Sequence, residues 1–197
     1  MPPMVTPGNG GGFRTDLFPG AHKSIWDLRS IFAESRHIFD VRLVGRPHPG
    51  LIGCAPSQAP LDTWHRHEAD LVVANRTRVP PLPSLPTAQD AVLGGLRAGP
   101  AFDRVAAEGA RTIPPREHGG NCDIKNPSRG TRVYFPVYVR GANRSMGDLH
   151  FAQGDREIAF WGQRDMAGWI DLQVDLIKGG MAGYGVLPRN TPACHQV

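Results

Sequence analysis

Residues 169–178 read WIDLQVDLIK and alternate between apolar and polar side chains along most of their length. In a strand, this alternation gives one apolar face made by Ile170, Leu172, Val174 and Leu176. Residues 132–140, RVYFPVYVR, alternate in the same way, and the proline at position 136 indicates an edge or a bulge. Residues 157–161 form a further candidate strand. Turn residues separate these runs, so residues 132–178 predict an antiparallel sheet or sandwich.

The residues before this region are mixed, with one clear helix. Apolar side chains between Leu61 and Val73 recur at helical spacing and predict an amphipathic helix there. Residues 23–35 fit either a helix or a strand, and their type stays open. Residues 46–56 hold three prolines and two glycines, which predicts a rigid loop. Residues 87–110 predict one or two short helices, interrupted at Gly99–Pro100.

The composition is that of a globular protein and excludes several classes. The chain has 197 residues, 40% hydrophobic and 20% charged, enough for one domain or two small ones. No apolar run approaches the roughly 18 residues of a membrane span, and residues 1–12 form a disordered, Pro/Gly-rich tail rather than a signal peptide. Three widely spaced cysteines without a CxxC pair argue against a disulfide framework and fit a reducing, cytoplasmic location. The net charge of +4 is spread along the chain without a basic block among aromatics, so neither a membrane nor a nucleic acid is an expected partner.

Side chains with catalytic capacity gather in two stretches, REHGGNCDIK at residues 116–125 and GDLHFAQGDRE at residues 147–157. In an extended chain Asp148 and His150 project to one face, and Asp155 and Glu157 do the same. Carboxylates with a histidine make a mixed oxygen and nitrogen ligand set that suits a divalent ion such as zinc, which would activate water and polarise a carbonyl. The alternative, turn carboxylates beside a histidine with ordinary hydrogen bonds, stays open at this point.

The residues Gly119–Gly120–Asn121 predict a flexible loop ahead of Cys122. Its backbone N–H groups are candidates for holding a substrate oxygen, as in an oxyanion hole, and a tight turn is the alternative. Cys122 has no base beside it in the sequence, which favours a small buried thiol over a nucleophile. His48, between two prolines, is a candidate substrate contact or simply a loop residue.

At these two stretches the chain resembles the acetamidase/formamidase family, and within it the formamidase branch. Further matching stretches are FPGAHKSIWDLRSIFAESRH at residues 18–37, HPGLIGCAPS at residues 48–57 and residues 130–185. The resemblance covers most of residues 13–187, a partial domain of the family, and leaves residues 188–197 as a divergent tail. It implies a mainly β (α+β) fold with β-sandwich-like antiparallel sheets and a smaller α/β part, incomplete relative to the family, in a homo-oligomer.

The resemblance also implies an activity, the metal-assisted hydrolysis of formamide or another short linear amide to a carboxylate and ammonia. Applied to this sequence, it gives a divalent metal, zinc by preference, held by Asp123, Asp148 and His150. The catalytic residues that it implies are Glu157, Asn121 and Asp155. The substrate-binding residues that it implies are His48, Gly119, Gly120 and Gln153.

The chain also departs from the family pattern. Arg156 stands where the family motif has glycine, and residues 160–165 differ from the small and apolar residues expected there. Family members extend beyond both ends of this chain, so we expect a middle fragment, from a truncated or frameshifted gene, that is inactive or nearly so alone. The alternative hypothesis is a non-catalytic remnant, or an association partner of a full-length amidase.

Overall fold

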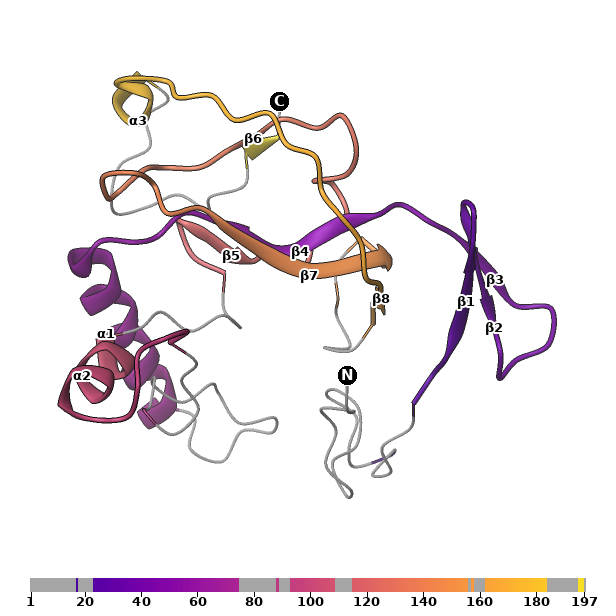
Figure 1. Ribbon diagram of the computed structural model, residues 1–197, viewed down its shortest axis with the longest axis horizontal. Coiled ribbons are helices and arrows are strands. Elements are labelled where there is room, and N and C mark those ends of the chain that lie inside the picture. Colours follow the sequence, from indigo (N-terminus) through magenta and orange to yellow (C-terminus); the bar gives the residue numbers. More distant parts are fainter. Residues whose placement is uncertain are drawn as a thin grey trace.

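The computed structural model describes residues 17, 23–74, 88, 93–108, 115–155, 157, 162–183 and 195–196. Three antiparallel sheets make up most of the regular structure (Figure 1). The strands are β1 (Trp26–Arg29), β2 (Phe32–Ser35), β3 (Arg42–Val44), β4 (His48–Gly53), β5 (Gly119–Asn121), β6 (Val133–Tyr134), β7 (Ser145–Ala152), β8 (Arg164–Asp165) and β9 (His195–Gln196). The helices are α1 (Gln58–Ala74), α2 (Pro100–Glu108) and α3 (Gly180–Gly183). The expected mainly β class with antiparallel sheets is confirmed.

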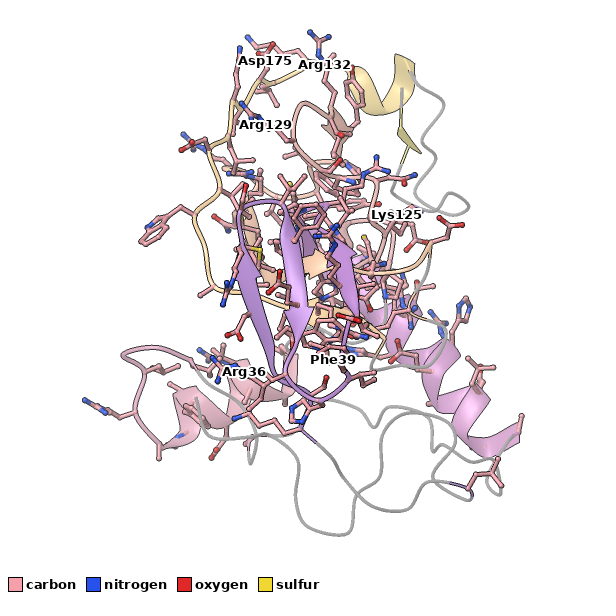
Figure 2. The ribbon with its side chains drawn as sticks, turned by 90° about the vertical axis from the view of Figure 1, so that its right-hand side faces the viewer. Arg36, Phe39, Lys125, Arg129, Arg132 and Asp175 are labelled. Carbon is pink, nitrogen blue, oxygen red and sulfur yellow. The ribbon has the colours of Figure 1, made fainter. Side chains whose placement is uncertain are left out.

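The first sheet settles the open assignment of residues 23–35 in favour of strands. Strands β1, β2 and β3 pair in that order, and β1 meets β2 with Trp26 opposite Ser35 and Arg29 opposite Phe32. Ser30 turns the chain between β1 and β2 with a φ of 54°, a left-handed conformation that suits a tight hairpin. Figure 2 looks onto this sheet, with Phe39 from the β2–β3 turn at its lower end.

The second sheet overturns the loop expected at residues 46–56. Strand β4 lies in its centre, in the order β5-β4-β7-β8, and Figure 1 shows the long β4–β7 pair between the first sheet and the helices. Pro49 is tolerated because pairing with β5 begins only at Leu51, while on the other edge Pro49 lies opposite Leu149 of β7. A segment rich in proline and glycine is therefore a strand because it has a neighbour on each side.

A small apolar core joins the two sheets. Ala33 from β2 packs with Phe151 and Ala152 from β7, and Trp26 and Met166 cover them. Glycine is required at position 45, because a Cβ there would lie 2.3 Å from the Cζ atom of Phe151. The chain thus passes from β3 into β4 directly over the Phe151 ring, which fixes the first sheet against β7.

Helix α1 contains the predicted range 61–73 and packs, through Trp64 and Glu68, against the segment that leads into β5. Leu61 and Trp64 are buried, and the indole of Trp64 stacks on the ring of His118 with 4.9 Å between the ring centres. Glu68, also buried, forms an ion pair with Arg116 beside this stack. A buried charge is stable only when it is paired, so this ion pair fixes α1 against the segment that precedes β5.

Helix α2 begins at Pro100, which confirms the break expected at Gly99–Pro100. Proline suits the first turn of a helix because its missing N–H would have no partner there. Within the described part of the chain, no helix has the length and apolar character that a membrane crossing requires.

The two strands on which the sequence prediction rested are shorter or absent. In residues 132–140 only Val133–Tyr134 pair, with β9, because the prolyl nitrogen at 136 has no proton to continue a ladder. Residues 169–177 pair with no strand in the described ranges, and the side chain of Trp169 is 98% exposed. Figure 2 shows Asp175 of this segment at the upper edge of the molecule. Of the candidate strand 157–161, residues 158–161 lie outside the described residues.

Candidate metal centre

The register of β4 against β7 brings the functional side chains to one face. His48 lies opposite His150, and the neighbouring pairs place Gly50 opposite Asp148. Directly opposed residues of antiparallel strands share a face, and residues two apart along a strand return to it. The structure therefore confirms that Asp148 and His150 project together, and it adds His48 and a glycine to the same face.

Gly50 leaves an opening beside these side chains that no other residue would leave. A Cβ at this position would lie 2.6 Å from the Nε2 atom of His150 and 2.8 Å from the Oδ2 atom of Asp148, closer than real contacts allow. Sequence reasoning missed this role because a Pro-Gly pair most often marks a turn. Only the strand register could reveal it.

Three side chains form a group of metal-ligand type. Single ligand atoms of Asp123, Asp148 and His150 all lie within 4.8 Å of one another. The Nε2 atom of His150 is 3.2 Å from Oδ2 of Asp148 and 4.0 Å from Oδ1 of Asp123. His150 is fully buried, and its Nε2 atom has no hydrogen-bond partner in the described part of the chain, nor has Oδ1 of Asp123.

These observations fit a divalent cation. Buried polar atoms without partners are costly, and here two of them lie close together beside the carboxylate of Asp148. Two carboxylates and an imidazole are ligands that zinc and related ions accept, and the glycine at position 50 keeps the adjacent space clear. The group is therefore a possible Asp/Asp/His metal site, and its chemistry does not fix which metal.

The backbone at both candidate carboxylate ligands is left-handed, with φ of 44° at Asp123 and 53° at Asp148. Such conformations cost non-glycine residues free energy, least for aspartate and asparagine, and they cluster at functional sites. The carbonyl of Gly50 accepts the amide protons of both Cys122 (2.9 Å) and Asp123 (3.1 Å). These two hydrogen bonds hold the turn that aims Asp123 at the cluster.

Glu157 lies beside Asp123, close enough for the two carboxyl groups to affect each other's ionisation. Burial and the neighbouring carboxyl group of Asp123 raise the pKa of Glu157 to about 7. Burial also raises the pKa of Asp123, against the Asn121 amide, which donates to its Oδ2 atom at 2.7 Å. Asp123 and Glu157 together therefore retain a proton up to near-neutral pH. A group with such a pKa can both accept and donate a proton at neutral pH, as a general acid or base must.

Gln153 contacts the centre from the end of β7. Its Oε1 atom lies 2.6 Å from Nδ1 of His150 and 3.0 Å from Nε2 of His48, and its Nε2 atom donates to the backbone carbonyl of Asp123. The other ring nitrogen of His48 lies 2.7 Å from the carbonyl of Arg46. His48 is buried with both ring nitrogens occupied, so the expected contact between His48 and substrate does not fit this structure.

The structure does not bring Asp155 to the cluster. Its side chain is 88% exposed and forms an ion pair with Lys125, which lowers the pKa of Asp155. The alternation that pairs Asp148 with His150 ends with β7 at Ala152, so the same argument does not extend to Asp155 and Glu157. Arg156, between them, lies outside the described residues.

Gly119 and Gly120 lie in strand β5 rather than in the expected flexible loop. Gly119 donates its amide to the carbonyl of Arg116 at 2.9 Å. Gly120 lies opposite Ile52 of β4. The pairs on either side, two residues away, are hydrogen-bonded (Cys54 with His118, and Cys122 with Gly50). Hydrogen-bonded pairs alternate along antiparallel strands, so the Gly120 amide also faces the β4 backbone. Neither amide is available to a substrate oxygen.

The fold and this cluster define a class, a mainly β protein with a carboxylate–histidine centre suited to a divalent cation. Comparison with known proteins gives the family. The protein-family model described as "Acetamidase/Formamidase family" matches residues 4–193, and the chain belongs to this family. The match reaches into residues 1–12 and 188–197, beyond the range 13–187 of the resemblance seen in the sequence.

Named relatives agree with this assignment. The chain is 58% identical to a formamidase from Methylophilus methylotrophus and 53% identical to an acetamidase from Mycolicibacterium smegmatis, each over 90% of this chain and 44% of the relative. A γ-lactamase from Delftia acidovorans has a similar structure, with a TM-score of 0.82 and 56% identity over 90% of this chain and 43% of that one. The chain thus spans less than half the length of the homologous amide hydrolases that it matches.

Proposed function

We propose that this chain carries the hydrolytic centre of an amidase that converts formamide, or another short linear amide, to a carboxylate and ammonia. The observation that carries the proposal is the position of the Asp123–Glu157 carboxyl pair beside the Asp/Asp/His group. One ligand-type residue, Asp123, belongs to both. The names of the relatives support the substrate class.

In this proposal Asp123, Asp148 and His150 hold one divalent ion, which we propose is zinc. When bound, such an ion polarises a carbonyl and lowers the pKa of water. The ion also adds charge close to Asp123, which favours the ionised form of that carboxylate.

Glu157 moves the proton. With a pKa near neutrality, it takes a proton from the attacking water and passes it to the amide nitrogen as the C–N bond breaks. Water supplies the oxygen of the new carboxylate, and ammonia leaves. Asn121 directs one N–H to Asp123, and we assign the second N–H of its amide group to the substrate carbonyl oxygen.

Ammonia release from formamide tests the proposal. The assay uses the zinc-loaded chain alone, and the chain mixed with the parts of the Methylophilus formamidase that it does not span. We expect at most weak activity alone, and activity in the mixture that Glu157→Gln abolishes and Asp155→Asn retains. Equal rates for wild type and Glu157→Gln in the active mixture would refute the role of Glu157, and no ammonia from either zinc-loaded sample would refute the proposal.

One observation favours the second candidate, an association partner of a full-length amidase. The segment 169–177 exposes an apolar row, including Val174 (69%) and Leu176 (65%), and no described strand pairs with it. Extended segments of this kind take up a further strand from a partner. We propose that a segment of the family fold beyond this chain's span covers it, because the similar γ-lactamase chain is more than twice as long as the part matched.

Co-purification with the complementary part of the Methylophilus formamidase tests this association. Leu176→Lys is expected to weaken it by at least about tenfold, since a buried lysine has no partner there. Val73→Lys on α1 is a matched control, because Val73 is exposed to a similar degree (62%) outside the segment. Equal binding by both variants, or a dimer of the chain alone through this segment, would contradict the assignment.

A further inference from the structure

One glutamine side chain connects the three segments that build the metal centre. The Oε1 atom of Gln153 lies within hydrogen-bond distance of His150 on β7 and His48 on β4, and its amide nitrogen bonds the backbone of Asp123. The resemblance to the family implied a substrate contact for Gln153. In the structure, the oxygen and the nitrogen of the Gln153 amide group both contact groups of the protein instead.

The orientation of the Gln153 amide group follows from its partners. The carbonyl oxygen of Asp123 only accepts hydrogen bonds, so the NH₂ group of Gln153 must face it. The Oε1 atom then faces Nδ1 of His150, and because this oxygen only accepts, Nδ1 must carry a proton. A neutral imidazole protonated at Nδ1 has its lone pair at Nε2.

The Nε2 atom of His150 behaves as this tautomer requires. It is buried and forms no hydrogen bond with any residue that the structure describes, although Oδ2 of Asp148 is only 3.2 Å away. With a proton at Nε2, that carboxylate would be its natural acceptor. With a lone pair there, both atoms are free to bind one cation.

We propose that Gln153 is a positioning residue that locks His150 in the tautomer whose Nε2 atom can bind a metal. The same side chain ties the backbone of Asp123 to His150, so two of the three ligands keep a fixed separation. This inference rests on the proposed metal-dependent function and extends it to a residue that does not touch the ion. Partners of this kind fix the ring and tautomer of a ligand histidine.

Removal of Oε1 is expected to release His150. In Gln153→Leu the ring would place its proton on Nε2, where Oδ2 of Asp148 accepts it, and would then have no lone pair for the ion. Zinc affinity should fall by about ten- to hundredfold, the usual effect of losing such a partner. In Gln153→Glu a carboxylate replaces the amide oxygen as acceptor and should restore the wild-type tautomer.

The test is ¹⁵N NMR of the histidine rings in the full metal-free chain, with the His150 signals assigned from a His150→Gln variant. We expect protonation at Nδ1 in wild type and Gln153→Glu, and at Nε2 in Gln153→Leu. Zinc affinity is measured by competition with a chelator, and circular dichroism checks that each variant is folded. Gln58→Leu is the matched control, because the Gln58 side chain bonds Asp62 on the exposed side of α1, and it should change neither measurement.

A proton on Nε2 of His150 in the metal-free wild type would overturn the proposal. So would a folded Gln153→Leu variant that keeps the wild-type tautomer or binds zinc within twofold of wild type. The tautomer is read without metal or substrate. The expected NMR pattern without amide hydrolysis would therefore support the role of Gln153 and count against the proposed reaction alone.

Discussion

Gly50 and His150 lie so close across the β4–β7 pair that a Cβ on Gly50 would be 2.6 Å from the Nε2 atom of His150. The absence of a side chain on one strand thus keeps a ligand atom accessible on the other. Strands β4 and β7 are far apart in sequence, yet the cluster needs both of them, His150 from β7 and a residue without a side chain from β4.

Gly50→Ala is therefore expected to weaken zinc binding by at least about tenfold, because the methyl group fills the ligand-facing space. It should also destabilise the fold by about 1–3 kcal/mol through overpacking. Calorimetric zinc titration and urea unfolding measure the two effects. Gly147→Ala on the facing strand is the control, since nothing lies within 4 Å of its added Cβ. Unchanged zinc affinity in Gly50→Ala would contradict the placement of the ion.

Asp148→Asn tests the ligand set without changing its shape. Asparagine tolerates the left-handed backbone at this position, so the fold should be retained. The charge of Asp148 raises the pKa of Asp123, so its loss should leave the metal-free chain at least as stable as wild type. Zinc affinity should fall by about ten- to hundredfold. Thermal unfolding with and without zinc measures both, and Asp62→Asn on α1 serves as the unaffected control.

The raised pKa of Glu157 predicts how the stability of the metal-free chain depends on pH. The folded carboxyl has a pKa of about 7 against 4.5 for the reference group, so the folded state holds more protons between these values. The contribution of Glu157 to the free energy of unfolding is therefore complete below pH 4.5 and is lost as the pH rises to about 7. Urea unfolding at pH 5 and pH 7 in a chelator should show this loss in wild type and a smaller one in Glu157→Gln. The same loss in both would show that Glu157 is not its source.

His118 predicts the opposite trend. Burial against Trp64 lowers its pKa, with a smaller lowering from Arg116 and an opposing effect from Glu117. As the pH falls below 6.5, the ordinary pKa of a histidine, the unfolded state takes up the proton first, so stability falls. His118→Phe keeps the stacking on Trp64 and should remove this part of the acid sensitivity. His67→Phe, at an exposed position of α1, should not, and equal acid sensitivity in wild type and His118→Phe would contradict the prediction.

Arg156 gives a prediction from sequence alone. A guanidinium stays charged at any working pH, so next to Asp155 and Glu157 it would compete with a cation or lower the basicity of a carboxylate. If Arg156 blocks the reaction in the isolated chain, Arg156→Gly should give formamide hydrolysis without added segments. If the reaction needs the parts of the relatives that this chain does not span, activity should appear only when those parts are supplied. Robust hydrolysis by the unmodified chain would refute the expectation of inactivity.

Local sequence pattern predicted the elements whose stability is local. The helix over residues 61–73 follows from its apolar spacing, because a helix satisfies its own backbone hydrogen bonds. The common face of Asp148 and His150 follows from the period of a strand. The order and types of residues in residues 116–157, together with the matching stretches elsewhere in residues 13–187, also sufficed to recognise the family, which the comparison confirms.

Strand pairing was decided by tertiary structure alone. Alternation in residues 169–178 shows that the chain can present one apolar face, but a strand forms only where a neighbour supplies hydrogen bonds, and none of the described strands does so there. Conversely, β4 forms through Pro49 and Gly50 because β5 and β7 lie on either side. The opening at Gly50, the exposed position of Asp155 and the double contact of Gln153 depend on that register, which no local pattern encodes.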